Sequence, residues 1–156
     1  MEFWKTIEVG GMRSSELLTG MIAEQIKIGA WVSVAVKSLP AIASPKRVVS
    51  FTQCEVADLG FSEMPTQKQI WEKVKKMYGL CTEDAAMYLR RHYMDQPVGE
   101  CLFVIAKPID WPLGNKSIFR LGCSNGDLHR QLRFQILPVD ELSHWPLKQK
   151  ITFQFK

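Results

Sequence analysis

The segment MYLRRHYMDQPVGE, residues 87–100, contains two arginines, a histidine, two tyrosines and two carboxylates. Glu100 is the most unusual of these groups, because it precedes a near-continuous apolar run that we expect to be a buried central strand, covered on both faces. A carboxylate at that position reaches solvent, pairs with a cation, or has a raised pKa and acts as an acid or base. Together with Asp95 and Arg90 it forms the candidate catalytic group, and Tyr93 is a candidate binding residue beside it.

The same segment also has a structural interpretation. At about 100° per residue, a helix over residues 82–93 turns His92 toward the core and turns Arg90 and Arg91 outward. His92 is then a histidine that hydrogen-bonds locally near the helix end. The two arginines belong either to a solvated charged face or to a pair that binds phosphate or carboxylate.

A turn is expected between this helix and the apolar strand. The sequence QPVG, residues 96–99, has proline in the second and glycine in the fourth position, which is typical of a type I turn. The residue before proline is disfavoured in helical geometry, so the helix must end by about Asp95. Asp95 can accept hydrogen bonds from the turn amides, which is a structural role. Glu100 is then the one carboxylate of the segment without a structural assignment.

A second candidate surface lies in the C-terminal third. In LHRQLRFQIL, residues 128–137, apolar residues alternate with a polar set that includes His129 and Arg133. Arg120 joins this polar face from the neighbouring strand, and Lys156 joins it from the last one. An antiparallel sheet with one solvated face explains the alternation. The alternative is a face that binds a ligand or nucleic acid, although it lacks aromatic residues on which RNA bases would stack.

The elements that position these residues indicate an α+β fold. Thr66 and Gln69 form a capping box at the start of a helix, and SNGD, residues 124–127, is a hairpin signal. Residues 31–40 fit either a strand or a short helix, and we favour the helix. The elements are expected in the order strand, helices, strand, helices and then a run of strands. This order predicts a mainly antiparallel sheet with three or four helices packed against it. We expect residues 1–156 to form a single globular domain.

Composition and charge restrict the class of protein. The chain is 46% apolar and 23% charged, as in soluble globular proteins. Its net charge is +4, and residues 101–156 carry eight Lys and Arg against four Asp and Glu. A pI near 8.9 permits an anionic partner without requiring one. No apolar run has the length of a membrane span and the N-terminus does not resemble a secretory signal, so we expect a cytoplasmic protein outside the membrane.

Several kinds of site lack their sequence signatures. The four cysteines are far apart and form no C-x-x-C pair, so we expect no zinc site, and they fit a reducing compartment. The chain contains no Gly-rich phosphate loop, no G-x-S-x-G motif and no H-E-x-x-H motif. The sequence therefore predicts neither a metal nor a cofactor. The cysteines are Cys54, Cys81, Cys101 and Cys123.

The motif L-R-x-x-Y-x-D-Q-P-x-G-E, residues 89–100, resembles the core of a family of small uncharacterised bacterial proteins. The similarity extends from Asp58–Phe61 to Trp145-Pro146 and the Phe153-x-Phe155 ending, and it covers about two thirds of the chain. The resemblance implies no activity, cofactor or catalytic residue, because none is assigned to that family. Arg91 and His92 depart from the family's pattern, which has an apolar residue and a glutamine there, and this weakens the case for a catalytic His92.

Two hypotheses about function follow. The first is a non-catalytic binding or interaction module, with a protein or nucleic-acid partner bound through Arg120, Arg133 and Lys156. The second is a small hydrolase-like or transferase-like enzyme that uses the candidate catalytic group. Catalysis would require those side chains to share one cleft and to include a carboxylate of perturbed pKa. We favour the first hypothesis, because no catalytic motif is present and the C-terminal third is basic.

Overall fold

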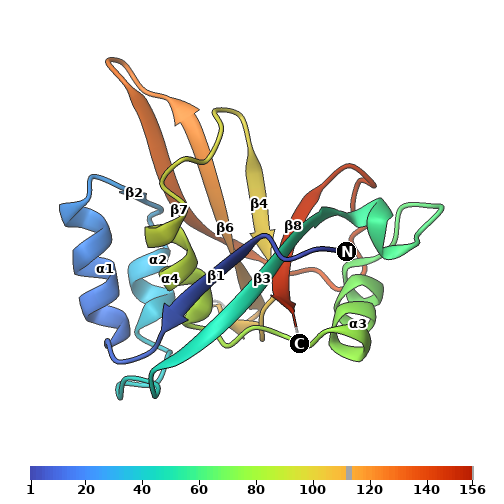
Figure 1. Cartoon of the computed structure of the whole chain (residues 1–156), viewed down its shortest axis with the longest axis horizontal. Coiled ribbons are helices and arrows are strands. Elements are labelled where there is room, and N and C mark those ends of the chain that lie inside the picture. The colour runs from blue at the N-terminus through green and yellow to red at the C-terminus, as the bar shows by residue number, and fades with distance from the viewer. Residues whose placement is uncertain (112–113, 156) are drawn as a thin grey trace.

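The computed structural model describes residues 1–111 and 114–155. In these residues the strands form one curled sheet, and the helices pack against it (Figure 1). The helices are α1 (Ser14–Ala23), α2 (Val32–Val36), α3 (Gln67–Met77) and α4 (Ala85–His92), with a 3-10 helix η1 (Val56–Leu59). The strands are β1 (Lys5–Val9), β2 (Lys27–Ile28), β3 (Arg47–Glu55), β4 (Cys101–Val104), β5 (Ile109–Asp110), β6 (Lys116–Asn125), β7 (Arg130–Pro138) and β8 (Lys150–Phe155). The mixture of helices with a mostly antiparallel sheet agrees with the sequence. No helix of the described residues has the length and apolarity needed to cross a membrane.

The sheet is larger and more curled than the sequence predicts. Its strands lie in the order β1-β3-β8-β4-β6-β7-β2, and β5 pairs with β6 outside this path. The pairs β4–β8 and β2–β7 are parallel, and the other pairs are antiparallel. Because β8 pairs with both β3 and β4, it joins the N-terminal strands and the C-terminal hairpin into one sheet. The very short strands β2 and β5 extend it further.

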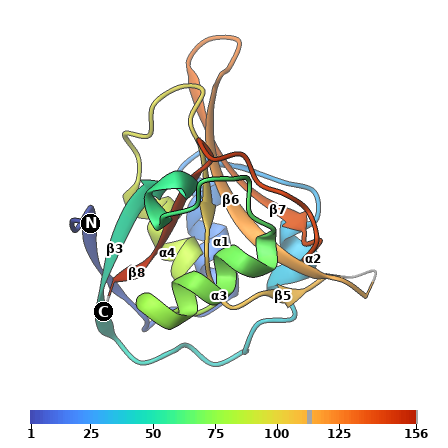
Figure 2. The same ribbon diagram turned by 90° about the vertical axis from the view of Figure 1, so that its right-hand side faces the viewer.

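Each face of the sheet has its own hydrophobic cluster. Helices α1, α2 and α4 cover one face, which we call the helical face (Figure 1). Helix α3, η1 and the loop before β8 cover part of the opposite face. The upper part of the β6–β7 hairpin extends beyond α3 and this loop (Figure 2). Among the described residues, no element therefore covers that part of the opposite face.

Helix α3 begins as the sequence predicts. The Thr66 hydroxyl accepts a hydrogen bond from the Gln69 amide at 3.3 Å, and the Gln69 side chain accepts one from the Thr66 amide at 2.8 Å. This reciprocal pair satisfies two amides that a helix start would otherwise leave without partners. Ile70 and Val74 are fully buried against the sheet. The predicted capping box and buried stripe are both confirmed.

Helix α4 differs from the sequence prediction in its exposed side. Arg90 is fully buried, and His92 is exposed with its Nδ1 2.9 Å from the Tyr88 carbonyl oxygen. The predicted outward Arg90 and inward His92 are therefore wrong. A helical wheel assumes one buried stripe, but α4 contacts both α1 and β1. Cover on several sides buries most of its residues.

Strand β4 is central, as predicted, but it is not covered on both faces. Leu102 and Val104 point into the helical face and are fully buried. Cys101 and Phe103 point to the opposite face and are only half-buried. The covering elements end before the upper part of that face. The predicted hairpin is confirmed, since β6 and β7 pair up to Asn125 and Arg130.

Candidate functional site

The carboxylate of Glu100 is held by three side chains at the start of β4. Its oxygens accept hydrogen bonds from the Tyr93 hydroxyl at 2.6 Å, from Lys150 Nζ at 2.7 Å and from Gln53 Nε2 at 3.4 Å. The Glu100 side chain is 6% exposed, whereas that of Lys150 is 45% exposed. Glu100 therefore has the cation partner that a carboxylate at the mouth of a buried strand needs.

These contacts keep Glu100 ionised. Burial acts to raise its pKa, but the hydrogen bonds from Lys150 and Tyr93 outweigh burial and hold the pKa of Glu100 below its ordinary value. Burial and the bond to Glu100 raise the pKa of the Tyr93 phenol. A general acid or base needs a pKa near the operating pH. The shift moves the pKa of Glu100 away from that range, which fits its ion pair with Lys150.

Arg90 lies in the interior between α4 and the β6–β7 hairpin. Its Nη1 donates to the Gln96 side-chain oxygen at 2.6 Å and to the carbonyls of Gly122 and Arg133, each at 3.3 Å. Its Nη2 donates to the Tyr93 carbonyl. Burial lowers the pKa of Arg90 to about 10, so the guanidinium remains charged at neutral pH. Among the described residues, the hydrogen-bond acceptors of this guanidinium are carbonyl oxygens and include no carboxylate.

Gln96 completes what we call the Arg90 clamp, meaning Arg90, Gln96 and the carbonyls that they bind. The Gln96 amide donates to the Leu121 carbonyl at 3.1 Å and to the Glu100 carbonyl at 3.4 Å. The Gly99 amide also donates to the Cys123 carbonyl at 2.8 Å. The clamp thus fastens the turn after α4 to β6.

The three candidate catalytic residues do not share a cleft. Arg90 is enclosed in the clamp and makes no ion pair with Glu100. Asp95 is exposed and has no side-chain hydrogen bond within the part of the chain described. Glu100 uses both oxygens on its own partners. The arrangement gives the enzyme hypothesis no geometric support.

The predicted polar sheet face has two of its members side by side. We call the uncovered part of the sheet, together with Phe103 at its border, the open face. Arg120 lies opposite Gln135, and Arg133 lies opposite Gly122, so the arginines are diagonal neighbours on adjacent strands. Such neighbours have Cα atoms about 7–8 Å apart. The open face consists of Cys101, Phe103, Arg120, Gly122, Ser124, Gln131, Arg133 and Gln135.

The arginines of the open face bond only to neutral groups. Arg120 donates from Nε and Nη2 to the Gln135 side-chain oxygen at 3.1 and 2.5 Å. Arg133 donates from Nε to the Ser124 hydroxyl at 2.7 Å. Among residues 1–111 and 114–155, neither arginine forms an ion pair. Arg91 on α4 differs, because its Nη2 lies 2.5 Å from Oε1 of Glu24, the C-cap residue of α1.

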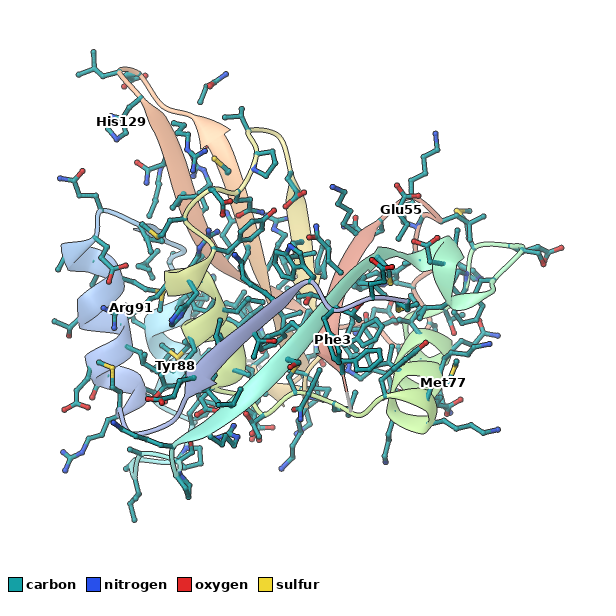
Figure 3. The ribbon with its side chains drawn as sticks, viewed as in Figure 1. Phe3, Glu55, Met77, Tyr88, Arg91 and His129 are labelled. Atoms are coloured by element: carbon teal, nitrogen blue, oxygen red, sulfur yellow. The ribbon has the colours of Figure 1, made fainter. Side chains whose placement is uncertain are left out.

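The other predicted binding residues lie elsewhere. The Tyr93 ring is buried at an end of the helical face, edge-on to Trp4 with ring centroids 4.7 Å apart. His129 is exposed at the end of the β6–β7 hairpin (Figure 3). Lys156 is outside the described residues. Of the predicted binding residues that the structure describes, only Arg120 and Arg133 are therefore brought together.

Sequence reasoning missed Lys150 and Gln53 as partners of Glu100, and Phe103 as a member of the open face. Lys150 reaches Glu100 because β4 and β8 are parallel neighbours, which no local pattern indicates. Phe103 lies in an apolar run where alternation between faces leaves no trace in residue type. The Arg120 guanidinium carbon lies 5.9 Å from the Phe103 ring centroid. The open face therefore has an aromatic residue that the sequence pattern did not reveal.

Comparisons with protein-family models, curated proteins and solved structures found no match. Within the part of the chain described, no group of three or more His, Cys, Asp and Glu side chains is placed to hold a metal ion. All four cysteines are free. Burial raises the pKa of the Cys81 thiol to about 12 and also raises that of Cys101, so neither is an activated nucleophile.

Proposed function

We propose that this chain, a single α+β domain, is a non-catalytic binding module that takes an anionic partner on the open face. The observation that carries the proposal is the pair Arg120 and Arg133, half-buried on adjacent strands and bonded only to neutral groups. A guanidinium presents a planar set of donors that suits carboxylate and phosphate. The charge of both arginines thus remains available to a partner.

The geometry around the pair supports the same proposal. Gly122 lies between Cys101 of β4 and Arg133 of β7 and has no side chain to fill the space. The Nη1 and Nη2 atoms of Arg133 have no partner among the described residues. The basic excess of residues 101–156 favours approach of an anion over long distances.

The proposal is tested with two anionic probes, an acidic octapeptide of Asp and Glu and a single-stranded RNA oligonucleotide. Binding is followed at low salt by amide chemical shifts of the labelled protein. We expect shifts in β6 and β7 and an affinity that falls as salt rises from about 50 to about 200 mM. The double variant Arg120→Gln/Arg133→Gln is expected to bind at least about tenfold more weakly, which corresponds to about 1.4 kcal/mol.

A matched control removes two positive charges from the helical side. Arg13 and Lys37 are exposed at the ends of α1 and α2, so the variant Arg13→Gln/Lys37→Gln has the same net charge as the open-face variant. We expect this control to bind as the wild type does. Equal loss in both variants, or no binding of either probe at low salt, would overturn the proposal.

A further inference from the structure

A pocket of mixed lining adjoins the open face near Ile118 and Leu137. It has a volume of about 270 Å³, and its apolar walls are Phe103, Ile118, Leu137, Pro138, Trp145 and Pro146. Polar residues, among them Gln67, His144 and Gln149, complete the lining. Phe103 belongs both to this pocket and to the open face, and the guanidinium of Arg120 lies beside its ring. A cationic surface and a pocket with apolar walls are therefore continuous.

The walls of this pocket are fixed by aromatic packing. The Trp145 ring lies 4.7 Å from the Phe103 ring and 5.8 Å from the Trp71 ring, measured between centroids. The Trp71 indole nitrogen donates to the Ala106 carbonyl at 3.0 Å. Pockets for drug-sized ligands have volumes of about 300–1,000 Å³. This pocket is smaller, so it suits one large side chain rather than a whole organic ligand.

The spacing of the arginines fits an extended peptide. Diagonal neighbours on adjacent strands are about 7–8 Å apart. Alternate side chains on one face of an extended chain are about 7 Å apart, since each residue adds about 3.3–3.4 Å. Carboxylates at positions i and i+2 of a peptide can therefore meet Arg120 and Arg133 together.

Nucleic acid fits this surface less well. Asp140 is on the rim of the pocket and Glu141 follows it. A polyanion that continued from the arginines toward the pocket would meet these carboxylates. Proteins that bind single strands use an extended positive groove with several stacking residues, and the open face has one aromatic residue, Phe103.

From this arrangement we infer that the partner is an acidic peptide segment with an apolar anchor residue. Two carboxylates of the segment bind Arg120 and Arg133, and one large apolar side chain enters the pocket beside Phe103. This inference rests on the proposed function and names its partner class. Burial of an apolar anchor contributes affinity that salt does not screen.

The inference is tested with a phage library of random dodecapeptides, selected on the full chain and counter-selected on Arg120→Gln/Arg133→Gln. We expect enriched sequences to contain two acidic residues at i and i+2 and a large apolar residue nearby. One enriched peptide, labelled with fluorescein, is then titrated with each variant. The variants Arg120→Gln/Arg133→Gln and Leu137→Gln are each expected to weaken binding at least about tenfold, and Arg13→Gln/Lys37→Gln less than about twofold.

A second pocket variant separates binding from folding. Ser143 is exposed on the rim, and its side chain makes no hydrogen bond within the described residues, so Ser143→Phe is expected to block the pocket without disturbing the core. Thermal unfolding of each variant checks that it is folded. Enriched acidic peptides without an apolar residue, or full binding by Ser143→Phe, would overturn the inference of an apolar anchor residue. Neither result would contradict the proposed function. Enrichment without acidic residues would overturn both. RNA binding without peptide enrichment would overturn the peptide inference alone.

Discussion

Arginine side chains lie on both faces of the β6–β7 hairpin, and they differ in burial and in hydrogen bonding. On the helical face, Arg90 is fully buried and bonds to Gln96 and to three backbone carbonyls. On the open face, Arg120 and Arg133 are half-buried and bond to one neutral side chain each. The carbonyls of Gly122 and Arg133 that the clamp holds belong to residues of the open face. The buried arginine therefore fixes the backbone on which the open-face arginines stand.

This contrast assigns different roles to residues of the same type. A buried guanidinium is costly unless its donors are bonded, and only the Nε of Arg90 has no partner among the described residues. Removing its side chain would take the donor from the Gln96 side-chain oxygen and from three backbone carbonyls in the interior. Removing an open-face arginine would leave only groups that water can reach. Stability and binding are therefore expected to depend on opposite faces of one hairpin.

The strongest test of this contrast is Arg90→Met, which keeps most of the side-chain volume and removes every donor. We expect the free energy of unfolding to fall by about 3 kcal/mol or more, because each buried acceptor that loses its partner costs about 1–3 kcal/mol. Urea unfolding followed by tryptophan fluorescence measures the change. A variant as stable as the wild type would mean that desolvation of the charge offsets its hydrogen bonds.

Arg91→Met is the matched control for that change. Arg91 is the next residue of α4, and its ion pair with Glu24 is partly exposed. Partly exposed ion pairs contribute about 0–1 kcal/mol. If Arg91→Met destabilised the protein as much as Arg90→Met, helix α4 would be sensitive to any arginine loss, and the clamp would have no special role.

A smaller effect is expected from Glu100→Gln, which removes the charge that Lys150 and Tyr93 hold. We expect a loss of about 1.5–2 kcal/mol near pH 7, at the low end of the range for a hydrogen bond to a charged group, because Lys150 is 45% exposed. The folded pKa of Glu100 is lowered from 4.5, so the stability it contributes is present above that pH. It is lost as the pH falls through the lower folded pKa. Urea titrations from pH 7 to about pH 3 should show the difference between wild type and variant shrinking.

The opposite pH dependence would change the interpretation of Glu100. If the difference grew as the pH fell from 7 toward 4, the folded pKa would be raised above 4.5 and not lowered. A carboxylate of raised pKa is what the enzyme hypothesis requires. The same titration therefore decides between an ion pair and a candidate acid or base.

Local chemistry accounts for the parts of the fold that sequence reasoning predicted. The capping box of Thr66 and Gln69 and the hairpin around Asn125 depend on neighbouring residues, so their signals are visible in a short segment. The alternation in residues 130–136 likewise separates Arg133 from the buried Leu132 and Phe134. The open face could therefore be predicted from alternation, and its arginines were.

The parts of the fold and of the site that the sequence did not predict depend on pairing between distant segments. Parallel pairing of β4 with β8 brings Lys150 to Glu100, and sequence distance conceals this contact. Arg90 occupies a position that a helical wheel makes exposed, and it is buried because the turn after α4 folds back over it through Gln96. A motif rich in charged residues indicated a candidate active site, whereas Arg90, Gln96 and Glu100 mainly hold backbone and neighbouring side chains in place.

The smallest expected effect on stability completes the comparison of the two faces. Arg120→Gln/Arg133→Gln is expected to change the free energy of unfolding by no more than about 0.5 kcal/mol per site, because Gln135 and Ser124 remain accessible to water. The same variant is expected to lose binding of an anionic partner. Thermal and urea unfolding at two salt concentrations measure the first quantity. A loss comparable to that of Arg90→Met would show that the open-face arginines support the sheet, and their surface would then be structural.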